Sequence, residues 1–328
     1  MILALLMVAA AADADPLVTF KDWTAGCDNG RACMAVGQFN AENFELASVV
    51  LQRGPLAGDQ PVIWFRQEDK IVDLAADGQR LNVKLNPDSD DFILTVDPAS
   101  TPKVLAALKS AKSLVPVEAD GKKGMPLSIS GATAAMRWID VQQKRVGTVT
   151  ALAATGDKPA SSVPAPPPLP TVPQAVPSGP LAKKLTDAEI KAIQEEYAEC
   201  SDDEDLQDKV DYARIDAHTT LAIVTAICGS GAYNYYGIPL LIADNGKRTE
   251  AAFEKHEESD LTMNLSWDGK ANVLSSYFKG RGIGDCGGGT DWVWDGKMFR
   301  IIKETAMSEC LGAIAWIPVF RARPVPAR

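Results

Sequence analysis

The chain has 328 residues, of which 46% are hydrophobic and 23% are charged, and its formal net charge at pH 7 is −10. This length suits about two globular domains of ordinary size, and the composition excludes both a disordered chain and a bundle of membrane helices. The negative charge argues against nucleic-acid binding, which needs a basic surface, so we expect no nucleic-acid partner. With only 2 histidines the chain cannot build a histidine-rich metal centre, and we expect neither a metal nor a cofactor.

The first residues predict an export signal. The stretch from Ile2 to Ala12 carries no charge and ends in small residues that suit a cleavage site. It is too short for the roughly 20 residues that a bilayer span requires. We therefore assign residues 1–14 to a signal peptide and expect a periplasmic or secreted protein with no membrane span.

The cysteines are even in number, with 6 in the chain. In an oxidising compartment such a set pairs into disulfides, although the sequence alone does not fix which cysteine meets which. Spacing favours pairing in sequential order, because Cys27 and Cys33 flank a turn-forming stretch. The expected bridges are Cys27–Cys33, Cys200–Cys228 and Cys286–Cys310.

Prolines dominate an uncharged segment between Pro159 and Pro180. Such a segment favours extended polyproline II and predicts neither a helix nor a sheet ladder. We place a Pro-rich linker at 156–182, between an N-terminal domain at 15–155 and a C-terminal domain at 183–328.

The N-terminal domain alternates short apolar runs with turn signals, a pattern typical of strands. Two helices interrupt it, one beginning after Ser100-Thr101 with Pro102 at its first helical position, the other following Ser130-Gly131 and stopping at Gly147. These elements predict a β-sandwich-like domain, or a barrel, with two helices packed on it. The predicted strands are Leu46–Leu51, Val62–Phe65, Ile71–Leu74, Leu81–Leu85 and Phe92–Val96.

The C-terminal domain opens with a capping box from Thr186 to Glu189, which predicts a leading helix. Asn-Gly and Asp-Gly pairs then separate apolar runs, a strong signal for β-hairpins. The whole chain is therefore predicted to be mainly β with a few helices (α+β), and this second domain to be antiparallel. Its predicted strands are Leu221–Cys228, Gly237–Ile242, Leu261–Leu265, Ala271–Phe278, Trp292–Trp294 and Phe299–Ile302.

Motifs for catalysis are few. The run Gly282–Gly287 matches a dinucleotide-binding pattern, but no helix signal follows it, so we reject that interpretation. A histidine-based triad is restricted to His218 or His256. Cys286 with His256 as its base would make a nucleophile, and the competing interpretation, a disulfide to Cys310, suits an exported protein better.

One region combines positive charge, aromatic rings and glycines. Lys279 and Arg281 stand beside two aromatic residues and a glycine-rich stretch, which is a pattern suited to a sugar or an anionic group. The alternative is that the aromatic residues are core and the two cations pair with local carboxylates. The candidate binding residues are Tyr233, Asn234, Tyr235, Lys279, Arg281, Asp285, Trp292 and Trp294.

Four segments carry a family resemblance: the run from Phe20 to Cys33, the stretch LSISGATAAMRWIDVQQKRVGT ending at Thr148, the run from Cys228 to Asn234, and LSSYFKGRGIGDCG followed by WVWDGKMFR. They resemble the bacterial family of domain of unknown function 1176. The first domain also resembles, more weakly, the invasion-associated locus B proteins. The resemblance implies an envelope-exported β-sandwich of a Gram-negative bacterium and supplies no catalytic residues.

We expect a non-enzymatic binding or interaction protein of the periplasm or cell surface, whose partner is an envelope or host-surface protein or a glycan. The alternative is an enzyme acting on cell-wall glycan, or an inhibitor of such an enzyme. In that alternative Asp285 and Asp291 act as acid and base, which requires carboxyl groups about 5 or 6.5–9.5 Å apart.

Overall fold

The computed structural model describes residues 16–37, 47–66, 70–88, 92–196, 210–226, 231–255 and 262–327. These residues form five sheets and three α-helices, so the prediction of a mainly β fold with a few helices is confirmed. The predicted signal peptide, the Cys200–Cys228 bridge and His256 lie outside the described residues. The Cys27–Cys33 and Cys286–Cys310 disulfides are both present.

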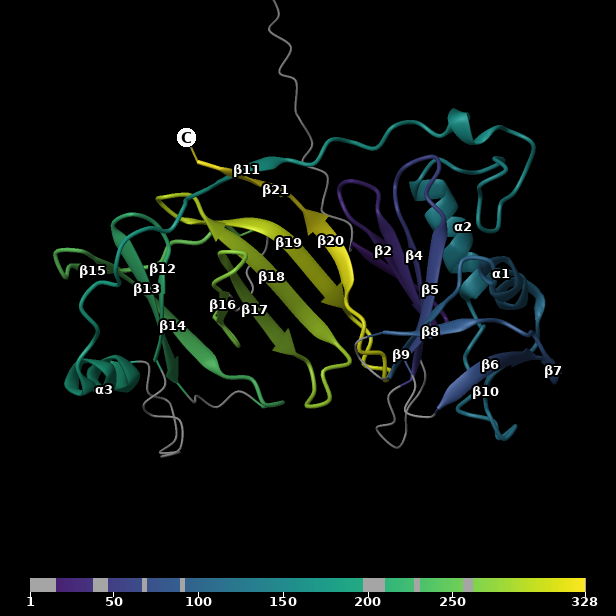
Figure 1. Cartoon of the computed structure of the whole chain (residues 1–328), viewed down its shortest axis with the longest axis horizontal. Helices are drawn as coiled ribbons and strands as arrows, with labels where there is room; N and C mark the ends of the chain where they lie inside the picture. Colours follow the sequence, from purple (N-terminus) through teal and green to yellow (C-terminus); the bar gives the residue numbers. More distant parts are fainter. Residues whose placement is uncertain are drawn as a thin grey trace, which may run out of the picture.

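The first half of the chain is built on a seven-stranded antiparallel sheet in the order β1-β2-β3-β4-β5-β9-β8, with a three-stranded sheet β10-β6-β7 beside it. Two helices, α1 (Thr101–Ser110) and α2 (Ala132–Gln142), pack on these sheets (Figure 1). The strands are β1 (Leu17–Phe20), β2 (Trp23–Cys27), β3 (Cys33–Gly37), β4 (Ser48–Arg53), β5 (Pro61–Arg66), β6 (Ile71–Ala76), β7 (Gln79–Arg80), β8 (Leu85–Pro87), β9 (Ile93–Val96) and β10 (Leu114–Glu118).

The helices bury one apolar stripe each. In α2 the buried residues recur at helical spacing, as in Ala132, Ala135 and Ile139. This helix begins after Gly131, whose φ is 101° and whose missing side chain admits the carbonyl oxygen of Phe20, 1.7 Å from where a Cβ would lie. A glycine is therefore required where α2 meets β1.

A buried polar cluster follows α2. The fully buried Asp140 carboxylate accepts the N–H groups of Leu152, Ala153 and Ala154 at 2.7–2.9 Å. Arg145, equally buried, donates to the carbonyl oxygens of Leu56 and Ala57, in the loop after β4, at 2.5 and 3.1 Å. The stretch 127–148, one of the two segments of this half that carry the family resemblance, is therefore a structural latch between α2 and its loops.

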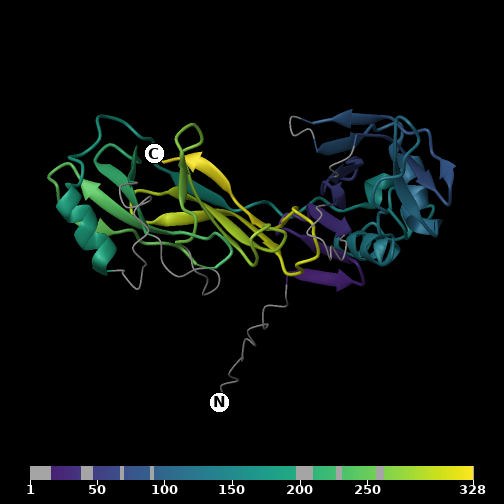
Figure 2. The ribbon, with the colours of Figure 1, turned by 90° about the horizontal axis from the view of Figure 1, so that it is seen from below.

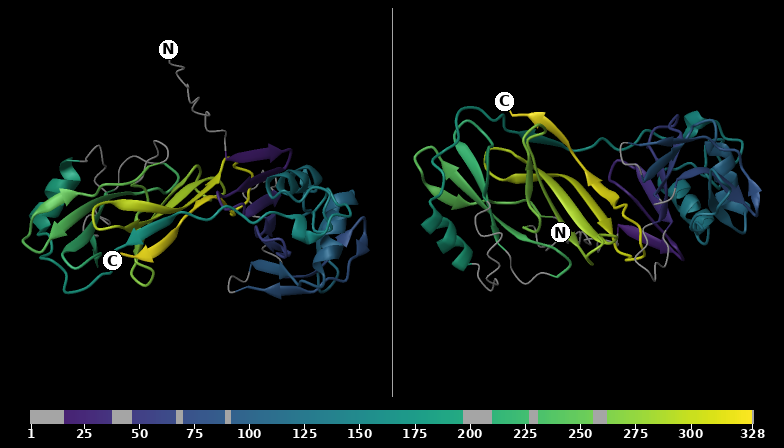
Figure 3. Two further views of the ribbon diagram at one scale, coloured as in Figure 1. Left: turned by 90° about the horizontal axis from the view of Figure 1, so that it is seen from above. Right: turned by 60° about the horizontal axis from the view of Figure 1, so that its bottom comes forward.

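The proline-rich segment corrects a prediction. It contains a short 3₁₀ helix (Ala160–Ser162) and a strand, β11 (Thr171–Gln174), that pairs in parallel with the C-terminal strand β21 (Arg323–Pro326). A ladder forms because the bonding N–H groups belong to residues that alternate with prolines: Arg323 donates to Pro170 at 2.8 Å and Ala327 donates to Gln174 at 2.8 Å. Figure 3 shows this segment leaving the first half and running along the second half beside the C-terminal strand.

The second half is a sandwich of two antiparallel sheets, β12-β13-β14-β15 and β16-β17-β18-β19-β20. Apolar residues from both sheets, Leu221 and Ile223 from one and Trp292 and Phe299 from the other, share one core. The predicted helix α3 (Asp187–Glu196) covers the outer face of the first sheet, and its capping box forms as expected. The strands are β12 (Val210–Arg214), β13 (Thr219–Ala226), β14 (Tyr236–Ala243), β15 (Arg248–Glu250), β16 (Ser266–Asp268), β17 (Val273–Lys279), β18 (Gly287–Trp294), β19 (Phe299–Met307) and β20 (Ile317–Arg321).

Two predicted strands are wrong. Residues 81–84 are not a strand, and β8 begins only at Leu85; of the predicted strand 261–265, the described residues 262–265 form no strand. In each segment an asparagine has a positive φ, 51° at Asn82 and 49° at Asn264, which interrupts an extended chain. Asparagine tolerates this conformation, so an apolar pattern around it does not guarantee a strand.

The two halves meet at an apolar junction. Met34, Val36 and Val50 from the first sheet lie in one buried cluster with Met307 and Ile317 of the second half. Figure 2 shows the halves end to end, with β20 and the loop before it against the first strands of the chain. Because this cluster is buried, the linker is not the sole connection between the halves.

Candidate functional site

One face of the sheet β16–β20 is left partly open. Its inner face is core, whereas the register of β17 and β18 places Ser275, Tyr277 and Lys279 on the other face, opposite Asp291, Gly289 and Gly287. At one end of this outer face β11 covers the sheet, because Val172 packs on Val293. At the other end lies the apolar junction between the halves.

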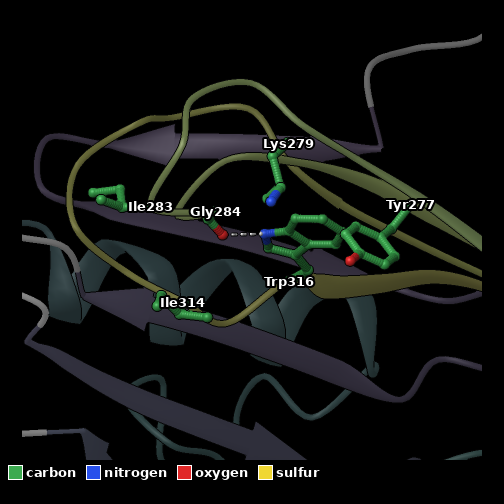
Figure 4. Close-up of a pocket in the computed structure, with 6 residues that line it drawn as sticks. All are labelled: Tyr277, Lys279, Ile283, Gly284, Ile314 and Trp316. Carbon is green, nitrogen blue, oxygen red and sulfur yellow. Dashed lines mark hydrogen bonds between the residues drawn. The ribbon is translucent and has the colours of Figure 1, made fainter. Parts of the chain in front are cut away.

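Two hollows lie on this outer face between those ends. We call the first, of about 370 Å³, the apolar hollow; it is lined by Tyr277, Lys279, Ile283, Gly284, Ile314 and Trp316 (Figure 4). The second, of about 220 Å³, is the polar hollow; it is lined by Ser275, Ser276, Tyr277, Gly289, Asp291, Lys303, Thr305 and Trp316. Tyr277 and Trp316 line both, so the two hollows adjoin.

The aromatic pair between the hollows is held in place by the chain around it. The ring centroids of Tyr277 and Trp316 are 6.2 Å apart with the planes inclined at 59°, and the Trp316 indole N–H donates to the Gly284 carbonyl at 3.2 Å (Figure 4). A Cβ at Gly289 would lie 3.5 Å from the indole, so the glycine lets the ring sit close to the sheet. Tyr277 remains 41% exposed.

Polar groups fill the second hollow. The Ser275 hydroxyl donates to Asp291 Oδ1 at 2.7 Å, and the Lys303 ammonium lies 3.7 Å from Asp291 Oδ2. The Thr305 hydroxyl donates to the Gly289 carbonyl at 3.3 Å. A carboxylate oxygen accepts more than one hydrogen bond, so Asp291 keeps acceptor capacity at the surface of this hollow.

The glycine-rich loop 280–286 forms one side of the apolar hollow through Ile283 and Gly284. Arg281 and Asp285 form an ion pair within it, and Asp285 also accepts the Gly312 N–H at 2.6 Å. Burial raises the pKa of Asp285, but the Arg281 and Gly312 hydrogen bonds outweigh it and hold that pKa below its ordinary value. The pairing alternative considered for Arg281 is thus the one that the structure shows, and Asp285 is too buried to meet a ligand.

The loop 231–235, which carries Tyr233 and Tyr235, borders the two hollows but is not among the residues that line them. The Asn234 side chain bonds both the N–H and the carbonyl of Lys279 at 2.9 Å, which ties this loop to the end of β17. Tyr233, 72% exposed, has the Lys279 ammonium 5.7 Å from its ring centroid. Tyr235 is attached through Asn264, whose Oδ1 accepts its N–H at 3.1 Å. Of the predicted residues, the structure therefore brings Tyr233, Asn234 and Lys279 together.

Trp292 and Trp294 do not belong to the predicted patch. Both are buried in the sandwich core, where their indole N–H groups donate to Glu254 and Asp216 at 3.3 and 2.6 Å. The sequence prediction missed Trp316, Ser275, Lys303 and Thr305. Strict alternation along β17 separates the outer residues 275, 277 and 279 from the inner ones, but Trp316 comes from a loop that no local pattern connects to β17.

The two aspartates considered as acid and base lie in different surroundings. Asp291 lies in the polar hollow, whereas Asp285 is buried in its ion pair beyond the start of β18. Asp285 is already bonded to Arg281 and to the Gly312 N–H, so it is not available as the second carboxyl group that glycoside hydrolysis needs.

Cys286 and His218, which were considered for catalysis, are not among the residues that line the two hollows. Cys286 is bonded to Cys310, so it is not the nucleophile considered above. His218 is 85% exposed at its side chain and lies 3.2 Å from Asp244. Among the described residues, no three histidine, cysteine or acidic side chains gather as metal ligands would. No described helix combines the length and the apolar character needed to cross a membrane.

Comparison with known sequences identifies the family. The family described as "Protein of unknown function (DUF1176)" matches residues 17–323. The chain belongs to this family. The DUF1176 match covers both halves and the linker, and the resemblance predicted from the sequence motifs is confirmed.

Two relatives of this DUF1176 chain show how far the similarity reaches. "Uncharacterized protein YpfG" of Escherichia coli is 28% identical over 335 residues, which cover 93% of this chain and 92% of that protein. The crystal structure of invasion associated protein B from Bartonella henselae is 16% identical, covers 39% of this chain and 98% of that one, and has a TM-score of 0.29. At that TM-score the second similarity supports no inference about the site.

Proposed function

We propose that the protein is a non-enzymatic glycan-binding protein, and that its site is the outer face formed by the two hollows. The observation that carries this proposal is the aromatic pair Tyr277–Trp316, partly exposed and flanked by the hydroxyl, carboxylate and ammonium groups of the polar hollow. Sugars present apolar C–H faces to aromatic rings and hydroxyl groups to polar side chains, so a site for them needs both kinds of contact.

The polar hollow offers complementary partners for a sugar ring. Asp291 accepts hydrogen bonds from hydroxyl groups and Lys303 donates to them, and the two lie 3.7 Å apart. A pair of neighbouring hydroxyls is therefore matched by one acceptor and one donor. This geometry favours glycans over envelope or host-surface proteins as the partner.

Binding without catalysis is favoured by the carboxylates. Of the described residues that line the hollows, Asp291 is the one that is acidic. Hydrolysis of a glycosidic bond needs a second carboxyl group within about 9.5 Å, and Asp285 is committed to Arg281. A glycan that docks on this face meets a binding surface without an acid–base pair.

We further propose that this glycan binding takes place in the periplasm or at the cell surface of a Gram-negative bacterium. The two disulfides within the described residues support an oxidising compartment, since such bonds are rare in the cytosol. The division into domains at 15–155 and 183–328, with 156–182 between them, is part of the same proposal. The separate cores of the two halves support it.

The proposal is tested by titrating the purified full chain with a tetramer of N-acetylglucosamine in a calorimeter. Tyr277→Ala is expected to weaken binding at least tenfold, because the sugar loses one of its two aromatic contacts. Phe278→Ala is a matched control: Phe278 is adjacent, 40% exposed against 41% for Tyr277, and points to the opposite face of β17. Thermal unfolding of each variant verifies that it is folded.

The affinities of the wild type and the two variants for the tetramer decide between the outcomes. Loss of affinity in Tyr277→Ala with little change in Phe278→Ala supports the proposal. Equal affinities of the wild type and Tyr277→Ala, or no binding of the tetramer by the wild type, overturn it.

A further inference from the structure

The apolar hollow differs from the polar one in a way that bears on the ligand. Its lining combines the side chains of Ile283 and Ile314 with the two aromatic rings, and Lys279 is the one charged residue among the described residues that line it. Four of the six described lining residues are apolar or aromatic, Tyr277, Ile283, Ile314 and Trp316, so the hollow suits an apolar substituent of a sugar better than a second solvated ring.

Lys279 is placed to meet an anion there. Its stem lies against Gly284, where a Cβ would be 3.4 Å from Lys279 Cδ, and Figure 4 shows its ammonium directed toward Trp316. The two neighbouring cations are each paired with a carboxylate, Arg281 with Asp285 and Lys303 with Asp291. Among the described residues no carboxylate lies within 4.0 Å of the Lys279 ammonium, and its ring contact is with Tyr233 at 5.7 Å.

We infer that the ligand is a sugar carrying a free carboxylate on a short apolar arm, the chemistry of N-acetylmuramic acid. This inference rests on the proposed function and names the class of glycan. The sugar ring lies on Tyr277 and Trp316 with its polar groups toward Asp291 and Lys303. The methyl-bearing arm enters the apolar hollow, and its carboxylate pairs with Lys279.

The arm explains why one hollow is apolar and singly charged. A neutral hydroxyl in that position would leave the Lys279 ammonium without an anion, and a bare carboxylate would leave the two isoleucines without an apolar partner. A lactyl ether supplies both a methyl group and a carboxylate. A charge-assisted hydrogen bond of this kind is worth about ten- to a hundredfold in affinity.

The requirement for a free carboxylate places the ligand in a reaction sequence. In bacterial cell-wall glycan the carbonyl carbon of the arm is joined by an amide bond to a peptide. Hydrolysis of that bond by water breaks the C–N bond, leaves the carboxylate on the sugar and releases the peptide as an amine. The reaction that supplies this ligand is therefore an amide hydrolysis that strips peptide from the glycan.

The test compares two sugars that differ only in the arm, N-acetylmuramic acid and N-acetylglucosamine, by calorimetric titration of the full chain. The wild type is expected to bind N-acetylmuramic acid at least tenfold more tightly. Lys279→Met keeps the stem against Gly284 and removes the charge, and it is expected to abolish this preference by weakening the binding of N-acetylmuramic acid. Lys297→Met, in an exposed turn after β18, is the matched control and keeps the preference.

The failures of the inference and of the proposed function are distinguishable. Equal affinities of the wild type for the two sugars, or a preference that survives in Lys279→Met, overturn the inference and leave the proposed glycan binding intact. If the wild type does not bind the tetramer of N-acetylglucosamine, the proposed function is overturned, and the inference that rests on it is overturned as well.

Discussion

Arg321 in β20 forms an ion pair with Asp28, which lies 293 positions earlier in the chain. The Asp28 side chain is completely buried, and its other oxygen accepts the N–H groups of Gly30 and Ala32, each at 2.9 Å. Asn29 adds two bonds to the backbone of Arg321, at 2.9 and 3.0 Å. The hairpin closed by the Cys27–Cys33 disulfide therefore holds the second half against the first.

Removal of the Arg321 guanidinium is expected to weaken this junction. Arg321→Ala leaves a buried carboxylate without its cation, and we expect a loss of about 2–4 kcal/mol in the free energy of unfolding. Urea denaturation followed by circular dichroism measures the loss. Arg323→Ala, two residues further along and exposed, serves as the control and should change stability by less than about 0.5 kcal/mol. Equal losses in the two variants would show that the ion pair with Asp28 has no special role.

Local signals were enough to predict much of the fold. Three of these signals each involve residues only a few positions apart, and the structure contains all three features: the helix start at Pro102, the Thr186–Glu189 capping box and the Cys27–Cys33 hairpin. The parallel pairing of β11 with β21 depends on residues more than 150 positions apart. A proline-rich sequence does not reveal which distant strand will donate N–H groups to its carbonyl oxygens, so this pairing was missed.

The candidate site was predicted only in part for the same reason. Lys279 and Asn234 were recognised because charge and aromatic residues surround them in the sequence. Trp292 and Trp294 also lie among aromatic residues in the sequence but face the core, where their indole N–H groups donate to residues outside β18. Trp316 reaches the site across Gly289 of a different strand, a contact that only the folded sheet creates.

Asp140 offers a second prediction, on the stability of the first half. Asp140→Ala removes the acceptor of three backbone N–H groups in a fully buried position. We expect a loss of about 3–5 kcal/mol, since each unpaired buried donor is costly. Thermal unfolding detects it. Asp120→Ala, in an exposed turn where its carboxylate accepts one N–H at 2.8 Å, is the control and should cost about 1 kcal/mol or less; a similar loss in both would contradict the latch described above.

Asp285 predicts part of the acid sensitivity of the protein. Because its pKa in the folded state lies below its ordinary value, its ionised form stabilises the fold above the unfolded pKa of about 3.9, and that contribution is lost as the pH falls through the lower, folded pKa. Asp285→Asn should therefore be less stable at pH 7 and show a smaller fall in stability between about pH 5 and pH 2. Urea midpoints across that range provide the measurement.

The control for this acid dependence is Asp211→Asn, which changes an exposed aspartate of β12. Its stability should follow the wild-type curve with pH. If Asp285→Asn follows that curve as well, then the Arg281–Asp285 pair does not contribute to acid unfolding.

Gly289 tests the geometry of the binding face without removing any of its polar or aromatic groups. A Cβ at this position would lie 3.1 Å from Thr305 Oγ1, 3.2 Å from the Ser276 carbonyl and 3.5 Å from the Trp316 indole. Gly289→Val should therefore push the indole away from the sheet and narrow the polar hollow, at a cost of about 1–3 kcal/mol in stability. We expect affinity for the N-acetylglucosamine tetramer to fall about tenfold, which corresponds to about 1.4 kcal/mol. Gly269→Val is the matched control, because a Cβ there meets only Trp267 Nε1, at 3.9 Å. A folded Gly289→Val protein that binds the tetramer as tightly as Gly269→Val would mean that the sugar does not rest on this part of the sheet.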